Sequence, residues 1–422
     1  MSTNNKEART QTRLAEFAAE SDLFDEAVAI AEDIYLSKDM GDSVMITTAE
    51  GNVVINTGFP GFGETHKSRF RKINDESIRY IVLTQCHANQ IGGAEDMRDA
   101  DTQVVVQRNF DECRQYWRIL HEFYARRSNK LWGDVLGKRG KIKPGMIREV
   151  AADITFDRHH CLELGGKRFE LYAVPGGESL DALVVWLPQQ KVLLSGNLFG
   201  PVFGNLPNLY TIRGDKIRSA SRFIESLALV RKLAPETIIT GHEIIEGNAE
   251  IDARLEQLGN AVRYIHDQTV EGMNRGKTVF DLMADIKLPP ALAVGQAHGK
   301  IQWCVRAIWE EYAGWFHYDS TTSLYEVPRS RVSRDFVELA GGIEALATRA
   351  SEHLAEGRPL EALHLIETAL QVDPDSRVAT EVAIQAHRML LERSGVENFS
   401  EVKWLESEVE RFESNLDGGG DA

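Results

Sequence analysis

The segment "VLTQCHANQIGGAED", residues 82–96, joins an apolar run to a helix through a loop of polar side chains. The β-prone residues 81–84 predict a strand, and the pair Gly92-Gly93 predicts the turn at which a helix begins. Between them stands one histidine, His87, among several amide side chains. The question is whether this loop binds a metal, binds it in an altered way, or has lost it.

Composition limits the answer before any motif is considered. The chain has 422 residues, of which 43% are hydrophobic and 27% charged, as in soluble proteins of two or three domains. Its formal charge of −16 argues against nucleic acid, which needs clustered Lys and Arg. No apolar run approaches the roughly 20 residues of a membrane span, and the N-terminus lacks a signal-peptide core. The four cysteines show no C-x-x-C spacing, so a reducing, cytoplasmic location is expected.

The pattern of apolar residues divides the chain into regions. Between about residues 41 and 250, short β-rich runs alternate with amphipathic helices, which predicts an α/β fold in which helices cover sheets, an αββα sandwich. From 251 to 395 the spacing is helical throughout. A helix pair around "EGRPLEALHLIETALQVDP" resembles one tetratricopeptide unit, which cannot bury its own face alone. Residues 1–40 are expected to form an N-terminal helical extension, and 396–422 a helix and a disordered tail.

Ordered motifs give the chain a specific resemblance. It resembles the metallo-β-lactamase fold superfamily, in the alkylsulfatase-like branch that carries an alkylsulfatase-type dimerisation domain. The resemblance covers about residues 40–395. The motifs that carry it are "INTGFP", "TQCHANQIGG", "VPGGESLDALVVWLPQQKVLLSGNLFG", "NLYTIRG" and "IITGHEIIEG", followed by "YIHDQTVEGMNRGKT" and "RAIWEEYAGWFHYDSTTSLYEVP" in the helical half.

The resemblance implies two metal-ligand sets at one edge of the sandwich. Loops of this kind commonly carry His-x-His-x-Asp-His, and of those four histidine or aspartate positions this chain keeps one histidine. By the family pattern, the first set takes Gln85, His87 and Glu178. The second set takes Asn89, Gln90 and His242, with Asn197 near both.

The replacements share one direction, because anionic or imidazole ligands have become neutral amides. An amide oxygen is a weaker zinc ligand than a carboxylate or an imidazole. The second set keeps His242 alone and is expected to be empty. The first keeps an imidazole and a carboxylate, so we expect one zinc or other divalent cation per chain, held by His87 and Glu178 with Gln85 or His242, or none.

Each candidate ligand also has a structural explanation. In that explanation His87 caps the helix at Gly92-Gly93, Glu178 neighbours a helix or turn start, and Cys86 is a buried structural thiol. His242 follows an apolar strand, where this fold places ligands, and with Glu178 it is the candidate acid or base. Sequence alone leaves these alternatives open.

A second signal concerns an anion. In relatives that cleave sulfate esters, the segment N-L-x-T-x-R-G contacts the sulfate, and Asn208 and Arg213 keep those positions, with Tyr210 between them. Arg offers a planar fork that suits sulfate, phosphate or carboxylate. The alternative is that Arg213 pairs with an acidic residue to hold the domain together. The aromatic and basic stretch 113–137 is expected either to line a pocket for an apolar substrate tail or to pack on its own core.

Three functions therefore remain open. The first is a metal-dependent hydrolase resembling alkylsulfatases, which acts on a small anionic or ester substrate with an apolar or aromatic part. The second is a related enzyme whose chemistry is metal-independent or not hydrolytic. The third is a catalytically silent binding protein. In each case the helical half is expected to build a homodimer, because it carries more apolar surface than it can hide alone.

Overall fold

The computed structural model describes residues 25–39, 41–137 and 148–418. Residues 1–24 of the expected N-terminal helical extension lie outside the described residues, as does the expected tail at 419–422. Residues 28–37 of that extension form strands rather than a helix, because Ile34 and Leu36 alternate into the core and pair with the next strand. The helical prediction is corrected there.

Thirteen labelled strands form two sheets within the described residues. The first sheet has the order β1-β2-β3-β4-β5-β6-β7. Its strands are β1 (Val28–Ala31), β2 (Ile34–Ser37), β3 (Ser43–Thr48), β4 (Gly51–Ile55), β5 (Ile78–Val82), β6 (Gln103–Gln107) and β7 (Ile154–Phe156). Strands β1 to β4 pair antiparallel, and β4 to β7 pair parallel.

The second sheet has the order β13-β12-β11-β10-β9-β8. Its strands are β8 (His159–Leu164), β9 (Lys167–Ala173), β10 (Leu183–Leu187), β11 (Val192–Gly196), β12 (Thr237–Thr240) and β13 (Ile244–Glu246). Only the β11–β12 pair is parallel among these.

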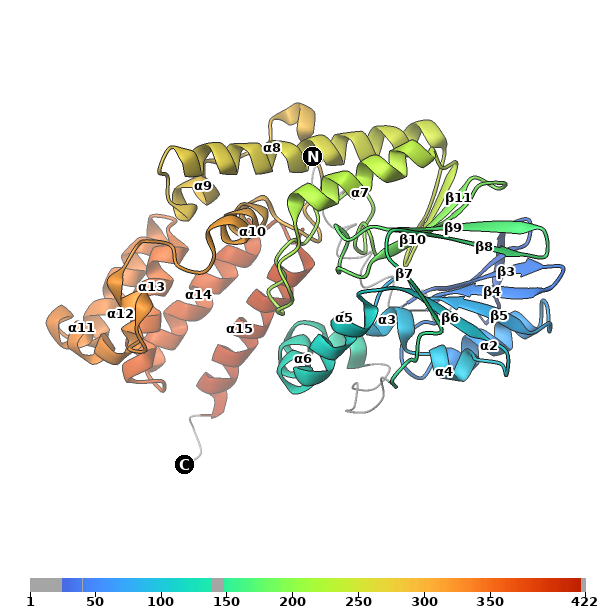
Figure 1. Ribbon diagram of the computed structural model, residues 1–422. Helices are drawn as coiled ribbons and strands as arrows, with labels where there is room; N and C mark the ends of the chain where they lie inside the picture. The colour runs from blue at the N-terminus through green and yellow to red at the C-terminus, as the bar shows by residue number, and fades with distance from the viewer. Residues whose placement is uncertain (1–24, 40, 138–147, 419–422) are drawn as a thin grey trace, which may run out of the picture. The chain divides into compact units, whose positions relative to one another are not determined.

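Residue alternation explains why the sheets stack. On β3, Val44 and Ile46 belong to the core shared by both sheets, whereas Met45 between them belongs to the core under the helices on the other face. On β4, Val53 and Val54 divide in the same way. Each sheet therefore has two buried faces, and Figure 1 shows helices outside both sheets. The predicted αββα sandwich is confirmed.

Helices of the same compact unit cover the outer faces, and this unit runs to Tyr312. The first sheet is covered on the side of α2 and α4, and the second on the side of α7 and α8 (Figure 1). The helices are α2 (Gly63–Arg71), α3 (Ala88–Ile91), α4 (Ala94–Met97), α5 (Phe110–Ile119), α6 (His121–Gly137), α7 (Ala220–Leu233), α8 (Asn248–Asn274), α9 (Val279–Asp285), η2 (Pro290–Leu292) and α10 (Ile301–Ala313).

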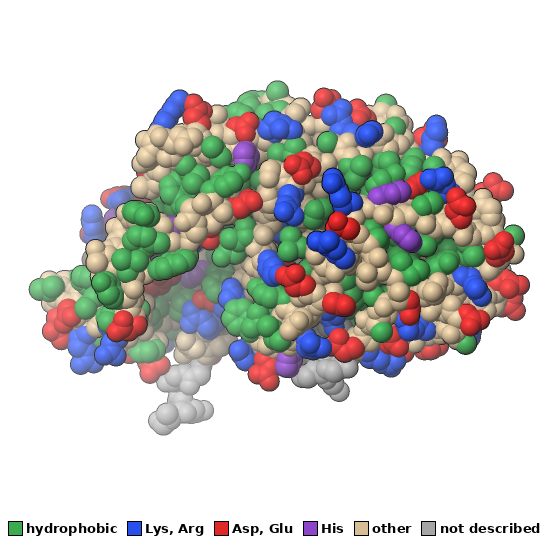
Figure 2. Space-filling view, in the orientation of Figure 1, with side chains coloured by type: hydrophobic (Ala, Val, Ile, Leu, Met, Phe, Trp, Pro, Cys, Tyr) green, Lys and Arg blue, Asp and Glu red, His purple; other side chains and the backbone are tan. Residues whose placement is uncertain are grey.

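A second compact unit begins at Ala313 and is helical wherever it is regular. Its elements are η3 (Thr321–Leu324), η4 (Arg329–Val332), α11 (Ser333–Ala340), α12 (Ile343–Ala355), α13 (Pro359–Val372), α14 (Arg377–Arg393) and α15 (Phe399–Gly418). Small residues such as Ala350, Ala362 and Ala383 let its helices approach closely around one core. The predicted all-α part is confirmed. Figure 2 shows hydrophobic side chains on the visible face of this unit.

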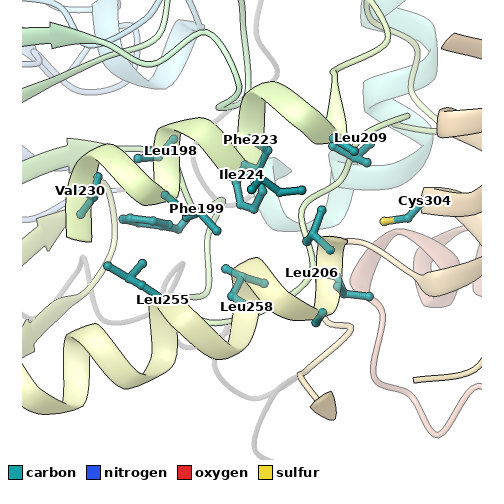
Figure 3. Close-up of a cluster of buried hydrophobic side chains, with 14 of the residues drawn as sticks. Leu198, Phe199, Leu206, Leu209, Phe223, Ile224, Val230, Leu255, Leu258 and Cys304 are labelled. Atoms are coloured by element: carbon teal, nitrogen blue, oxygen red, sulfur yellow. The ribbon is translucent and has the colours of Figure 1, made fainter. Parts of the chain in front are cut away.

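The largest part of the core lies under α7 and α8. Phe199, Phe223, Leu255 and Leu258 are buried there, and Figure 3 shows their side chains meeting between the two helices. This packing fixes the segment 198–209, which leads into the polar residues described below. None of the described helices is both long and apolar enough to cross a membrane.

Candidate functional site

The loop between β5 and α3 is held in shape by its backbone and by an amide. The Oδ1 atom of Asn56 accepts hydrogen bonds from the backbone N and the Oγ1 of Thr84, at 2.9 and 3.0 Å. Asn56 has a φ of 58°, a region that Asn tolerates better than most residues. His87 is the residue before α3, yet its side chain makes no capping hydrogen bond. Capping therefore does not account for this histidine.

Gln85, His87 and Glu178 do come together. The Nε2 atom of Gln85 lies 2.6 Å from Nδ1 of His87 and 3.3 Å from Oε2 of Glu178. The same carboxylate oxygen is 3.5 Å from Nδ1 of His87. The other oxygen, Oε1, is 3.1 Å from Nε2 of His298. Glu178 thus lies between two imidazoles.

Burial and neighbouring charges fix the protonation of this group. Burial acts to raise the pKa of Glu178, but hydrogen bonds with His298 and His87 hold it well below its usual range. His242 feels the charges of both Glu178 and His298, and burial lowers its pKa to about 4 despite the attraction of Glu178. At neutral pH the site therefore holds an ionised carboxylate and a neutral His242.

Asp215 joins this group to the predicted anion site. Its Oδ2 atom lies 3.8 Å from Nε2 of His87, 3.7 Å from a terminal nitrogen of Arg213 and 3.4 Å from one of Arg218. Two arginines therefore share one carboxylate. Arg213 also stacks over the ring of Trp117 at 4.7 Å, and its buried Nε atom has no hydrogen-bond partner. Pairing with Asp215 does not use all of the Arg213 donors.

The other two predicted anion contacts lie differently. Asn208 is buried, its backbone carbonyl accepts from Arg218 at 2.8 Å, and its side-chain Oδ1 has no partner. Tyr210 instead lies beside Glu310 of α10, and burial followed by that carboxylate raises the pKa of its hydroxyl. A substrate contact from Tyr210 stays a prediction.

The residues at the second ligand set form an amide pair. Gln90 Nε2 donates to Asn197 Oδ1 at 3.0 Å, and both side chains are buried. Gly241 passes so close that a Cβ there would lie 2.4 Å from the same Asn197 oxygen. The backbone carbonyl of Asn89 packs still more closely on Gly41, where a Cβ would lie 1.8 Å from its oxygen. The Oε1 atom of Gln90 is buried without a hydrogen-bond partner, and these neutral amides are weaker cation ligands than carboxylates or imidazoles.

The residue types around Glu178 include ligands that suit a divalent cation. The imidazoles of His87 and His298 contact the carboxylate of Glu178, and His242 feels its charge; imidazole and carboxylate are ligands that zinc and similar cations prefer. The buried Nε2 atom of His87 has no hydrogen-bond partner. Within the described part of the chain, these ligand atoms are not gathered within 4.8 Å of one another, so a cation would have to draw them together.

A pocket opens beside these residues, with about 390 Å³ of empty space that includes open solvent. Trp117 of α5 forms one wall and stands edge-on to His87, with ring centroids 5.4 Å apart. Tyr124 of α6 is buried against Trp117, whereas Phe123 is exposed. The stretch 113–137 thus both lines the pocket and packs on itself. The lining also includes Cys86, Cys113, Glu178, Asp215 and Arg218.

Sequence reasoning missed three residues of this group: Asp215, Arg218 and His298. Asp215 directly follows the segment "NLYTIRG", so its nearness to Arg213 was available as a signal. His298 lies between α9 and α10, in "GQAHGK". Gly200, with a φ of 71°, leaves room for the His298 ring, since a Cβ there would lie 2.6 Å from its Cδ2. No local pattern predicts a contact across that distance in sequence.

Comparison with known proteins gives two family matches. The sequence model described as metallo-beta-lactamase superfamily matches residues 36–242, and the one described as alkyl sulfatase dimerisation matches residues 278–402.

Relatives of known type agree with both matches. A linear primary-alkylsulfatase from Pseudomonas sp. (strain ATCC 19151) is 28% identical over 372 residues, which are 82% of this chain and 69% of the relative. The alkyl/aryl-sulfatase BDS1 of Saccharomyces cerevisiae is 24% identical over 393 residues, 86% of this chain and 60% of that protein. Each match therefore covers a smaller share of the relative than of this chain.

A solved structure shows the same fold. The stereoselective inverting sec-alkylsulfatase Pisa1 from Pseudomonas sp. superposes with a TM-score of 0.79 over 94% of this chain and 67% of that chain, at 20% identity. At that identity the likeness concerns the fold alone.

Proposed function

The chain belongs to the metallo-beta-lactamase superfamily and carries an alkyl sulfatase dimerisation region, and on this premise we propose that it hydrolyses a small anionic ester. The observation that supports this most is the buried Glu178 carboxylate between His87 and His298, beside the arginine pair that shares Asp215. The two relatives described above are alkylsulfatases, so sulfate esters are the first class to test.

The arginine side of the pocket is proposed to hold the anionic group of the substrate. Arg213 is largely buried and has donors left over after Asp215, so an anion with several oxygens suits it. The Oδ1 atom of Asn208 is buried without a partner, and as an acceptor it cannot donate to an anion. The amide nitrogen of the same side chain is the donor that would face an anion. Trp117 supplies an apolar wall for the remainder of the ester.

One divalent cation is proposed at Glu178, His87 and His242, with His298 in place of a family ligand. When bound, such a cation lowers the pKa of a bound water molecule towards about 7 and polarises an ester oxygen. Gln85 Nε2 lies 2.6 Å from Nδ1 of His87, which is also the ring nitrogen nearer to Glu178, whereas Nε2 of the imidazole faces Asp215 at 3.8 Å. His242, neutral at pH 7, is in the form that binds a metal or accepts a proton from water.

A second candidate is an enzyme of the same fold whose chemistry needs no metal. The Gln90–Asn197 amide pair favours it, because these positions no longer offer charged ligands. In that case Glu178 and His242 would move the proton themselves. Silent binding without turnover is the remaining outcome. We also propose that the protein is cytoplasmic and that it forms a homodimer.

Substitution of Glu178 tests the proposed site. A panel of alkyl and aryl sulfate, phosphate and carboxylate esters is offered to the full chain, to Glu178→Gln and to Glu163→Gln, an exposed glutamate on β8. We expect turnover of at least one anionic ester, reduced about 100-fold or more in Glu178→Gln and unchanged in Glu163→Gln. Equal turnover in the two variants would remove Glu178 from the reaction.

A further inference from the structure

Two cysteines and an aspartate meet behind the His87 loop. Cys86 lies in that loop, Cys113 on α5, and Asp181 in the turn before β10, and all three side chains are buried. One ligand atom from each lies within 4.8 Å of the other two. None of these three side chains takes part in the proposed reaction.

The loop geometry separates this group from Glu178. Gln85 and His87 direct their side chains to Glu178, whereas Cys86 between them packs in the core under the first sheet. The bend at residues 84–87, between β5 and α3, separates the two directions. The cluster is therefore a second set of donors on the other side of the same loop.

Asp181 gives an independent reason to expect a ligand. Ser179 donates to its Oδ1 at 2.5 Å and the Cys113 thiol also interacts with the carboxylate, whereas its Oδ2 atom is buried without a hydrogen-bond partner. The whole residue is 1% exposed. A buried carboxylate oxygen without a donor is costly unless a proton or a cation neutralises it. The two sulfur atoms beside it are metal ligands once deprotonated.

The arrangement leaves one position open. Cys86 and Cys113 line the pocket, and Asp181 does not appear in its lining. In a tetrahedral zinc site the ligand atoms lie roughly 3.5–3.8 Å apart, so three atoms within 4.8 Å need only a small contraction. A fourth ligand, water or a substrate atom, would then come from the pocket. Arg114 and Arg218 are buried cations of the same region, one next to Cys113 on α5 and one in the pocket wall.

We propose that Cys86, Cys113 and Asp181 form a binding site for a thiophilic divalent cation of the zinc class, with its fourth position open to the pocket. The site does not depend on the ester hydrolysis proposed above. It is also separate from the cation proposed at His87, since the two sets share no ligand. Binding releases the thiol protons, and no bond between heavy atoms of the chain is formed or broken.

Cobalt titration of the full chain tests the site, because a thiolate bound to Co²⁺ gives a near-ultraviolet charge-transfer absorption that imidazole and carboxylate do not give. The chain is purified without a metal-chelating tag, stripped of metal under reducing conditions and titrated with Co²⁺. We expect this absorption to saturate at one Co²⁺ per chain and to decrease when Zn²⁺ is added.

Variants assign the absorption to its residues. We expect Cys113→Ser to lose it, Asp181→Asn to weaken Co²⁺ binding at least 10-fold, and His87→Ala to keep it. Cys161→Ser, which changes a half-exposed thiol on β8 outside the cluster, serves as the matched control and should keep it.

Two results would overturn the proposal. One is the absence of the thiolate absorption from the reduced, folded wild-type chain, which would leave Cys86 and Cys113 as packing residues. The other is an absorption that persists in Cys113→Ser. The wild-type titration needs no variant, so it decides even if a substituted cluster fails to fold.

Discussion

Glu178 owes its ionisation to two imidazoles on opposite sides of one carboxylate. Sequence identified this residue and His87 by their places in a family pattern, and the structure brings them together with Gln85. The third partner, His298, was not predictable, because its contact depends on how α10 packs against the second sheet. Residue types were readable from the chain, whereas partnerships between distant loops were not.

A buried histidine outside the site gives a prediction about acid stability. His66 is fully buried, its Nδ1 lies 2.7 Å from the Oγ of Ser37, and burial lowers its pKa from 6.5 to about 3. The unfolded chain therefore binds a proton at this residue between pH 6.5 and about 3, while the folded chain does not. The stability that this neutral histidine contributes is present above pH 6.5 and is lost as the pH falls to about 3.

We expect His66→Gln to remove the contribution of this one titrating group to the pH dependence of the free energy of unfolding. The free energy of unfolding of the wild type should fall by up to about 1.4 kcal/mol per pH unit more steeply than that of the variant across this window. Urea unfolding of both proteins at several pH values measures the slopes. Parallel slopes would show that His66 titrates normally in the folded chain. His121→Gln, an exposed histidine, is the matched control.

At the scale of elements, the loops at the ends of β5, β11 and β12 decide the site. Their positions followed from the sequence, because apolar runs ending in Gly-rich polar segments are typical of strands that lead into site loops. Their internal bonding did not follow. The Gln90–Asn197 pair joins α3, which follows β5, to the residue after β11. Because β5 and β11 belong to different sheets, these amides meet only when the two sheets stack.

A substitution at Gly241 tests the close packing of the loop that precedes His242. A Cβ at Gly241 would lie 2.4 Å from Asn197 Oδ1 and 3.1 Å from Gln90 Nε2, so Gly241→Ala must push the amide pair apart. We expect a loss of about 1–3 kcal/mol in the free energy of unfolding, as for other overpacked sites. Gly133→Ala on α6, where a Cβ meets nothing within 4 Å, is the matched control. Equal stability of the two variants in denaturant unfolding would contradict this account of the loop.

At the scale of the whole molecule, the sequence predicted both halves of the chain and their fold classes. The described N-terminal residues were the exception, since two short strands pair there where a helix was expected. Pairing with β3 outweighs the local preference, because Ile34 and Leu36 gain burial in the core between the sheets. Tertiary contacts of that kind are not visible in a short window of sequence.

The apolar surface of the helical unit leads us to predict a homodimer. Large apolar side chains are exposed on it, including Trp315, Tyr318 and Leu339, and this is more than an isolated unit usually presents. We expect light scattering to give about twice the chain mass of 47.3 kDa. Leu339→Glu should shift the protein towards a monomer, whereas Ile119→Glu, an exposed apolar position in the other unit, should not. A wild-type monomer at micromolar concentration would contradict the prediction.

The proposal of a hydrolase with one metal at His87 and Glu178 is tested most directly by turnover after metal removal. The full chain, stripped by a chelator and then resupplied with one divalent cation at a time, is assayed against an anionic ester that the untreated protein cleaves. We expect turnover to be lost on chelation and to be restored by a resupplied divalent cation in wild type and in Cys161→Ser, but not in His87→Ala. Turnover that survives complete chelation, or no turnover of any anionic ester by the resupplied protein, would contradict it.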